Sequence, residues 1–211
     1  FELEDYQTYF DDYDLLPLKF IQTNVTGIGA TRTFIRNYYS VGTKILQIDD
    51  DIKEIKSKQT GFILKDFFNE MFNTMKIENS KFAGCCPYDN EFYMKEGYST
   101  NLKYTGGHLI AEIIRESPLE VFERHFEDYI ANIEYFKLDK KLIRFNDVYV
   151  KTKYYNPKGG IVESYGSLEE RKIDAEILAK QLEQKYKGWC TAYYKKKFQV
   201  YNLRLNSHVS L

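Results

Sequence analysis

The sequence predicts a mixed α/β fold in a single domain, and three observations support this. A chain of 211 residues with 43% hydrophobic residues is long enough to bury a substantial core. Between residues 16 and 48, an apolar run, a glycine-containing turn, a helical pattern and a second apolar run follow one another, as in a β-loop-α-β unit. Helix-like and strand-like patterns then alternate to the C-terminus. We therefore expect a mainly parallel central sheet flanked by helices, with an antiparallel strand region.

The N-terminal unit is the clearest architectural signal. Gly27 and Gly29 supply turn chemistry, and Gly42 ends the helix that follows them. The elements are expected at residues 2–10 (short helix), 16–21 (strand), 31–39 (helix) and 44–48 (strand, KILQI).

The rest of the chain continues the alternation. Ser117 and Glu120 form a capping box with Pro118 at the first helical position, which predicts a helix from Pro118 through Phe136. Ser167 caps a last helix that ends before Gly188. The other elements are expected at residues 65–76 (helix), 80–86 (strand), 91–114 (strands, with a turn at 96–97 and a glycine pair at 106–107), 142–155 (strand), 157–160 (loop) and 198–205 (strand).

Composition excludes several classes of protein. With 30 basic and 31 acidic residues the chain has no overall field that attracts nucleic acid, so any anion must be held by a local site. No apolar run approaches the roughly 18 residues of a membrane helix, and the acidic N-terminus lacks a signal pattern. Cys85, Cys86 and Cys190 have neither disulfide nor metal-ligand spacing. We expect a soluble, cytoplasmic protein with three core thiols.

The segment KILQIDDDI places three aspartates at the end of an apolar strand. Asp49 and Asp51 share a face if the strand continues, so their carboxylates converge and favour a cation between them. Hard oxygen donors select Mg²⁺, Mn²⁺ or Ca²⁺ over zinc, and ligands of open α/β sheets bind beyond the carboxyl ends of strands. A metal on two carboxylates suits a diphosphate substrate, because it neutralises the leaving group.

These residues resemble a known family. The first half of GT-A glycosyltransferases carries an aspartate-any-aspartate motif after a Gly/Arg helix, and about residues 16–52 are similar to it. The matching positions are Gly27, Gly29, Arg32, Arg36, Gly42 and residues 45–51. The Tyr/Lys/Asn-rich character is similar to the glycosyltransferase domains of large algal DNA viruses that decorate capsid protein, which implies the host cytoplasm.

The resemblance implies a GT-A-like (Rossmann-like) domain that transfers a hexose or deoxyhexose from a UDP-sugar to a glycan or glycoprotein hydroxyl, with Mn²⁺ or Mg²⁺. The half of the domain at about residues 16–115 would bind the nucleotide sugar and the metal, and the half at about residues 116–211 would bind the acceptor. Asp51 would bind the metal, and Asp49 the metal or the ribose. The remaining nucleotide-binding positions would be Gly27, Gly29, Arg32, Arg36 and Asp50. A base-binding strand normally precedes this unit, and none is visible ahead of Phe1, so recognition of the base is left open.

Two further roles follow from the resemblance. A histidine late in the domain often completes the metal shell, and His208 is the candidate. Glu127 and Asp128 resemble the pair from which inverting members draw a general base. A helix beginning at Pro118 would place this pair in mid-helix on a solvated face, so a retaining mechanism stays open.

Other patterns have competing interpretations. Gly106-Gly107-His108 is compatible with the close approach of a sugar or with a β-bulge. Residues 193–197 (YYKKK) are compatible with an anion site, but we favour a strand edge protected by lysines. The strongest rival function is an NAD(P)-dependent oxidoreductase, because Asp49 follows Gly29 by the twenty residues of a ribose-binding acid.

The oxidoreductase interpretation is the weaker one. Tyr154 and Lys158 have dehydrogenase spacing, but Pro157 breaks the helix that would align them, and Arg32 replaces the third glycine of the fingerprint. A noncatalytic interaction module, with the aspartates as a surface run, is a third interpretation.

Overall fold

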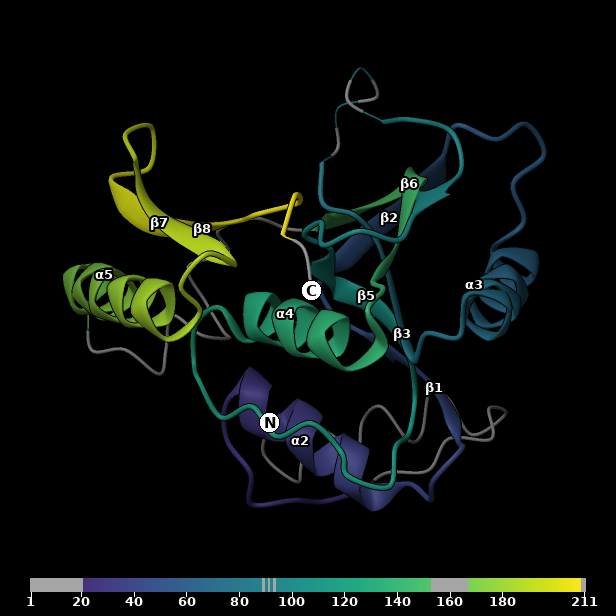
Figure 1. Cartoon of the computed structure of the whole chain (residues 1–211), viewed down its shortest axis with the longest axis horizontal. Helices are drawn as coiled ribbons and strands as arrows, with labels where there is room; N and C mark the ends of the chain where they lie inside the picture. The colour runs from purple at the N-terminus through teal and green to yellow at the C-terminus, as the bar shows by residue number, and fades with distance from the viewer. Residues whose placement is uncertain (1–20, 89, 91, 93, 153–166, 210–211) are drawn as a thin grey trace, which may run out of the picture.

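The computed structural model describes residues 21–88, 90, 92, 94–152 and 167–209, and within them four helices and eight strands are assigned (Figure 1). The expected helix at 2–10, residues 16–20 of the first expected strand and the 157–160 loop lie outside these residues. The helices are α2 (Ile28–Tyr38), α3 (Leu64–Glu78), α4 (Glu127–Asp139) and α5 (Leu168–Lys185). The strands are β1 (Lys44–Ile48), β2 (Ile52–Ser57), β3 (Phe82–Cys86), β4 (Tyr98–Ser99), β5 (Gly106–Ile113), β6 (Ile143–Thr152), β7 (Cys190–Lys195) and β8 (Val200–Leu205).

The main sheet is mixed, with strand order β1-β5-β3-β6-β2 and β4 added beside β6. Only β3 and β6 pair in parallel, whereas β1–β5, β3–β5, β2–β6 and β4–β6 are antiparallel. The expectation of a mainly parallel sheet is therefore wrong for the described part of the chain. The local β-α-β order suggested a parallel neighbour for β1, but β1 pairs with β5, a strand some sixty residues later in the chain.

The connection between β1 and β2 requires this sheet to curl. The two strands stand at opposite ends of the strand order, which in a flat sheet would separate them by roughly 19 Å. Three aspartates, Asp49 to Asp51, join them, and four residue steps span at most about 14 Å. The two edges must therefore approach one another, and the aspartates lie where they meet.

The helices cover two faces of the sheet. Along β5 the side chains alternate: Leu109 and Ala111 pack with α3, whereas Ile110 faces α4. Glu112 shares the face of Ile110 and forms a buried ion pair with Arg36 of α2, Oε1 to Nη2, at 2.7 Å. Figure 1 shows α3 on one side of the strands and α4 on the other. His108 has the same parity as Ile110 and Glu112, so it lies on the face that α2 and α4 cover.

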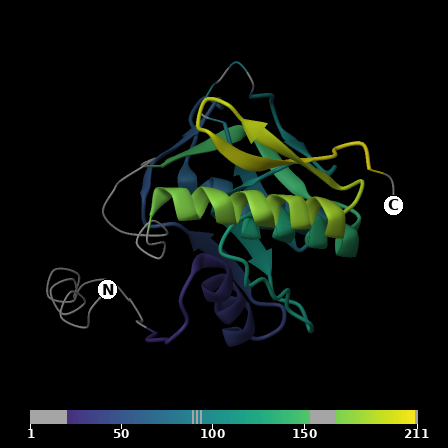
Figure 2. The same ribbon diagram turned by 90° about the vertical axis from the view of Figure 1, so that its left-hand side faces the viewer.

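The C-terminal part adds a helix and a hairpin. Strands β7 and β8 pair in antiparallel register, and α5 lies along them (Figure 2). Ala179 and Leu182 of α5 and Leu203 of β8 share one core with Ile130 and Ile133 of α4. The hairpin is thereby held beside α4, at a fixed place relative to the sheet.

Most elements agree with the sequence patterns. The patterns of α2, α3, α5, β1, β3, β6 and β8 are confirmed, with bounds shifted by a few residues. The Ser167 side chain accepts a hydrogen bond from the Glu170 backbone N–H, as a helix cap should. Strand β2 was not expected, because its run IKEIKS is charged and none of its residues is fully buried. The three cysteines are buried and unpaired.

The start of α4 differs from the prediction. The helix begins at Glu127 and not at Pro118. The backbone of Val121 is instead fixed by α2: Val121 N–H donates to Thr33 Oγ1 at 2.9 Å, and that hydroxyl donates to the Val121 carbonyl at 2.8 Å. These tertiary hydrogen bonds override the capping box, and Phe126, with φ of 61°, leads the chain into the helix. Glu127 and Asp128 therefore stand in the first turn, not in mid-helix.

Candidate metal centre and adjoining cleft

Sheet pairing brings the aspartates beside a histidine. Ile48 is in register with Leu109, and the Asp49 N–H donates to the His108 carbonyl at 3.0 Å. The chain turns at Asp50 and Asp51, which returns the Asp51 side chain toward the same place. One ligand atom each from Asp49, Asp51 and His108 lie within 4.8 Å of one another. We call this group the Asp-Asp-His triad.

Asp49 is ionised by its surroundings. Its Oδ2 lies 3.1 Å from His108 Nδ1, and its Oδ1 accepts from Arg32 Nη2 at 3.2 Å. Burial acts to raise the pKa of Asp49, but the His108 hydrogen bond and the charges of Arg32 and His108 outweigh it, so the pKa lies below its usual value. The pKa of His108 is raised, because Asp49 and the charges of Asp51 and Asp128 outweigh the effect of burial.

Asp51 lacks a partner for one of its oxygens. Its Oδ1 is buried and forms no hydrogen bond within the described residues. Burial, and then the charges of Asp49 and Asp50, raise the pKa of Asp51, although His108 opposes them. An acceptor without a donor, beside a second carboxylate and an imidazole, is what a divalent cation would satisfy. The residues present therefore fit a metal ion.

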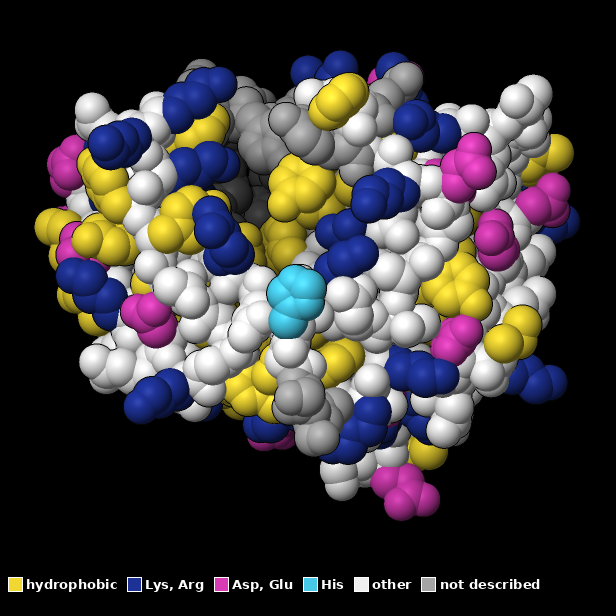
Figure 3. All heavy atoms as spheres, turned by 45° about the horizontal axis from the view of Figure 1, so that its top comes forward, with side chains coloured by type: hydrophobic (Ala, Val, Ile, Leu, Met, Phe, Trp, Pro, Cys, Tyr) yellow, Lys and Arg dark blue, Asp and Glu magenta, His cyan; other side chains and the backbone are white. Residues whose placement is uncertain are grey.

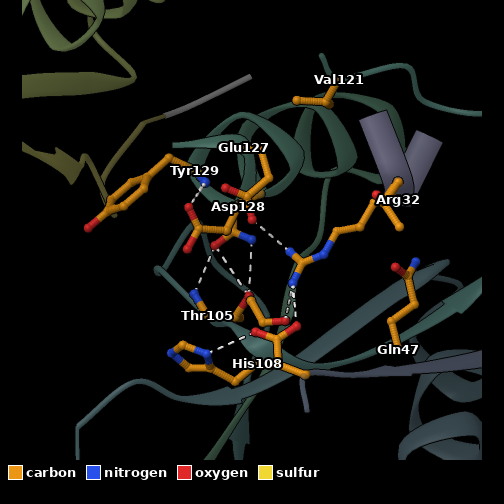
Figure 4. A network of polar contacts seen from close by, with 12 residues as sticks. Arg32, Gln47, Thr105, His108, Val121, Glu127, Asp128 and Tyr129 are labelled. Carbon is orange, nitrogen blue, oxygen red and sulfur yellow. Dashed lines mark hydrogen bonds and ion pairs between the residues drawn. The ribbon is translucent and has the colours of Figure 1, made fainter. Parts of the chain in front are cut away.

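Arg32 connects the triad to a second pair of carboxylates. From α2, its Nη1 donates to Glu127 Oε1 at 2.9 Å, while Nη2 donates to Asp49 and, at 2.6 Å, to the Gly107 carbonyl. Figure 4 shows this side chain extending from α2 into the space between Glu127 and His108. A Cβ on Gly107 would lie 2.7 Å from Arg32 Nη1, so any larger residue there would require the guanidinium to move.

Glu127 and Asp128 are partly buried at the start of α4. Burial, followed by the charge of Asp128, raises the pKa of Glu127 to about 7, although Arg32 opposes the shift. Burial also raises the pKa of Asp128, against the hydrogen bond that it accepts from the Tyr104 hydroxyl. The Tyr104 pKa is raised by burial and by the Asp128 charge, so the phenol keeps its proton and donates it. A carboxyl that titrates near neutrality is suited to general acid–base work.

A cleft of about 720 Å³ adjoins these groups. Its lining includes His108 of the triad, Glu127 and Asp128 of α4, and Tyr193 and Lys195 of β7. In Figure 3 the surface is hollowed between the β7–β8 hairpin and the rest of the molecule. A ligand in this cleft would contact Glu127 and Asp128 of α4 directly, and it would adjoin the Asp-Asp-His triad at His108.

The remaining predicted site residues lie elsewhere. His208 is exposed and does not belong to the triad, in which His108 occupies the third position. Asp50 is exposed on the turn. Arg36 is 2% exposed and bound to Glu112 in the core, which leaves it little surface for a ligand.

The two glycines serve the placement of α2. Gly27, with φ of 90°, precedes the helix, and its carbonyl accepts from the Thr31 N–H at 2.9 Å. A Cβ on Gly29 would lie 2.6 Å from the Glu123 carbonyl oxygen, so this glycine allows the 121–123 segment to pack against α2. That packing accounts for Gly29 without a phosphate. Tyr154 and Lys158, the dehydrogenase pair, lie outside the described residues.

Sequence reasoning missed the parts played by His108 and Tyr104. His108 was noted for the glycine pair before it, but its pairing with the aspartates depends on the β1–β5 register, which no local pattern encodes. Tyr104 reaches Asp128 only because α4 begins at Glu127. The basic residues that line the cleft come from six separate segments, and among them only Lys195 belongs to a run noted in the sequence, YYKKK.

Comparison with protein-family models, with curated proteins and with solved structures finds no match to this chain. Within its described part, no helix combines the length and apolar character needed to cross a bilayer. A function for the protein is therefore argued from the residues of the triad and the cleft.

Proposed function

We propose that the protein is a metal-dependent glycosyltransferase that transfers a sugar from a nucleoside-diphosphate sugar, a UDP-sugar by the resemblance of residues 16–52, to an acceptor hydroxyl. One observation carries this proposal. The Asp-Asp-His triad, with an unpartnered buried oxygen on Asp51, lies beside a cleft that Glu127 and Asp128 line. A cation site next to a carboxyl that titrates near pH 7 fits the departure of a diphosphate and the deprotonation of a hydroxyl.

The residues divide between the two ends of the reaction. A divalent cation held by Asp49, Asp51 and His108 would neutralise charge on the departing diphosphate. In the cleft, the acceptor oxygen forms a bond to the anomeric carbon while the bond from that carbon to the diphosphate oxygen breaks. Glu127 takes the proton of the acceptor hydroxyl, and Asp128, held by Tyr104, adjoins it. Such a direct displacement inverts the anomeric centre.

Arg32 would couple the two ends. Its guanidinium contacts a ligand of the proposed metal, Asp49, and the proposed base, Glu127. Because the positive charge of Arg32 stabilises the ionised form of Glu127, Arg32 helps to keep this carboxylate available as a base near neutral pH. Arg32 is thus a positioning residue, not one that touches the reacting atoms.

The first experiment measures binding by thermal shift with UDP, with and without Mn²⁺. We expect UDP to raise the melting temperature only when Mn²⁺ is present. Asp51→Asn should abolish this shift, and Asp50→Asn, which removes the same charge from an exposed neighbour, should retain it. A shift that survives Asp51→Asn, or no shift with any nucleoside diphosphate, would sink the metal-dependent proposal.

The second experiment tests the base. Hydrolysis of UDP-sugars by the wild-type protein is measured with Mn²⁺ across pH 5.5–8.5, because a transferase slowly transfers to water. We expect the rate to rise as the pH passes about 7, where Glu127 ionises, and Glu127→Gln to lower it by roughly 10²–10⁴-fold. A full rate in Glu127→Gln would remove this residue from the mechanism while leaving the metal site standing.

A further inference from the structure

The lining of the cleft is strongly basic, although the chain as a whole has a formal net charge of −1. Two carboxylates line it, Glu127 and Asp128. The Lys and Arg side chains that line it are Lys103, Arg124, Arg144, Arg171, Lys195 and Arg204. Figure 3 shows Lys and Arg side chains on both sides of the hollow. The positive charge is therefore concentrated at the place where a ligand would enter.

Two of the cations that line the cleft have no carboxylate partner among the residues that the structure describes. Lys103 and Arg144 form no ion pair with any carboxylate of the described residues. Burial, and then the positive charges of Arg144 and Lys95, lower the pKa of Lys103, and burial lowers that of Arg144. Such an arrangement is unfavourable by itself, and an anion between the two cations would relieve it.

Neutral acceptors fix the position of Arg144. Its Nε donates to Asn146 Oδ1 at 2.9 Å, and its Nη1 donates to the Tyr104 carbonyl at 3.3 Å. The hydroxyl of the same Tyr104 donates to Asp128. Tyr104 thus contacts both Arg144 and Asp128, so an anion bound at Arg144 would lie near one of the two α4 carboxylates.

The β7–β8 hairpin forms the opposite side of the cleft. Arg204 of β8 lies over the Tyr193 ring, 5.1 Å from its centroid, and Lys195 lies 4.6 Å from the Phe198 centroid. Neither cation pairs with a carboxylate in the part of the chain that the structure describes. Tyr193, which also lines the cleft, offers a ring against which a sugar can pack.

We infer that the cleft holds an anion subsite, centred on Lys103 and Arg144, for a phosphate-bearing sugar or short glycan that serves as the acceptor. The assignment of the ligand as acceptor rests on the proposed function, whereas the binding of the anion does not. A small ligand is favoured over a nucleic-acid strand because the near-neutral chain has no overall field to hold a long polyanion.

Binding of inorganic pyrophosphate tests the subsite. Titration calorimetry is performed on the whole chain in EDTA, at constant ionic strength, so that the proposed metal site plays no part. We expect binding in EDTA, with affinity at least tenfold weaker in Lys103→Gln and in Arg144→Gln. Lys65→Gln, which removes an exposed lysine of α3 away from the cleft, should bind as the wild type does. Circular dichroism melting identifies any variant that fails to fold, and Lys103→Gln alone then decides.

Three outcomes would overturn the inference. Pyrophosphate that does not bind in EDTA, or binds Lys103→Gln and the wild type equally, removes the subsite. Binding that requires Mn²⁺ and is lost in Asp51→Asn places the phosphate at the triad instead. A single-stranded oligonucleotide that binds more than a hundredfold more tightly than a sugar phosphate makes the ligand a nucleic acid. If pyrophosphate binds in EDTA but UDP with Mn²⁺ does not, the subsite stands and the glycosyltransferase proposal falls.

Discussion

Replacing Arg32 by methionine tests whether this cation holds the site together. The substitution removes the donor to Glu127, Asp49 and the Gly107 carbonyl in a side chain that is 5% exposed. The buried carbonyl of Gly107 loses its partner, which costs about 1–3 kcal/mol. This part of the loss does not depend on pH.

The loss at Glu127 depends on pH in a way that can be bounded. With Arg32 present the pKa of Glu127 is about 7, above the 4.5 of an unperturbed glutamate, so its ionised form is already disfavoured in the folded state. Without Arg32 the pKa rises further, and the folded protein takes up a proton rather than bury an unpaired charge. Linkage limits the added loss to about 1.4 kcal/mol for each pH unit above 7, and to nearly zero at pH 6.

Urea denaturation in EDTA at pH 6 and pH 8 measures both parts. We expect Arg32→Met to lose about 1–3 kcal/mol of unfolding free energy at pH 6, and up to about 1.4 kcal/mol more at pH 8. In the Glu127→Gln background the difference between the losses at the two pH values should shrink, because the α4 carboxyl that Arg32 contacts can no longer titrate. An equal or smaller loss at pH 8 in the wild-type background would show that Arg32 does not stabilise the Glu127 carboxylate.

Two further substitutions test the geometry of the site. Gly107→Ala places a Cβ 2.7 Å from Arg32 Nη1 and should lower the unfolding free energy, measured by urea denaturation, by about 1–3 kcal/mol. In the control Gly106→Ala the nearest atom to the new Cβ is 3.5 Å away, so the loss should stay below about 1 kcal/mol. Equal losses would mean that the guanidinium is free to move aside. Asp51→Asn should leave the melting temperature of the protein in EDTA unchanged or raised, because it removes a like charge from the triad, while a marked fall that Asp50→Asn does not share would make Asp51 a structural residue.

Local patterns were sufficient where short-range physics decides the structure. The run KILQI forms β1, and the cap at Ser167 forms as expected, because strand alternation and helix capping depend on neighbouring residues. The capping box at Ser117 failed because Thr33, more than eighty residues away, holds the Val121 backbone. A local preference of about 1 kcal/mol does not withstand two buried tertiary hydrogen bonds.

The site was predictable in part. Asp49 and Asp51 were expected to converge on one face of a continuing strand, whereas β1 ends at Ile48 and a turn at Asp50 and Asp51 brings both aspartates into one group of candidate ligands. The third member was expected to be His208, whereas the group contains His108, 59 residues beyond Asp49. This difference is one of strand pairing: β1 runs antiparallel to β5, so the end of β1 meets the start of β5, and His108 stands there.

The three aspartates serve the fold and the site together. They join β1 and β2, which stand at opposite ends of the strand order, and a connection of three residues can reach from one to the other only if the sheet curls. The curl places them beside the start of β5, where Gly107 admits Arg32 and His108 faces Asp49. A polar cluster at such a closure carries like charges that an ordinary turn would leave in solvent, and the raised pKa of Asp51 and its unpartnered oxygen are the consequence. Arg32 offsets part of this charge through its contact with Asp49, and Asp51 Oδ1, which has no donor among the described residues, is where we place the metal ion.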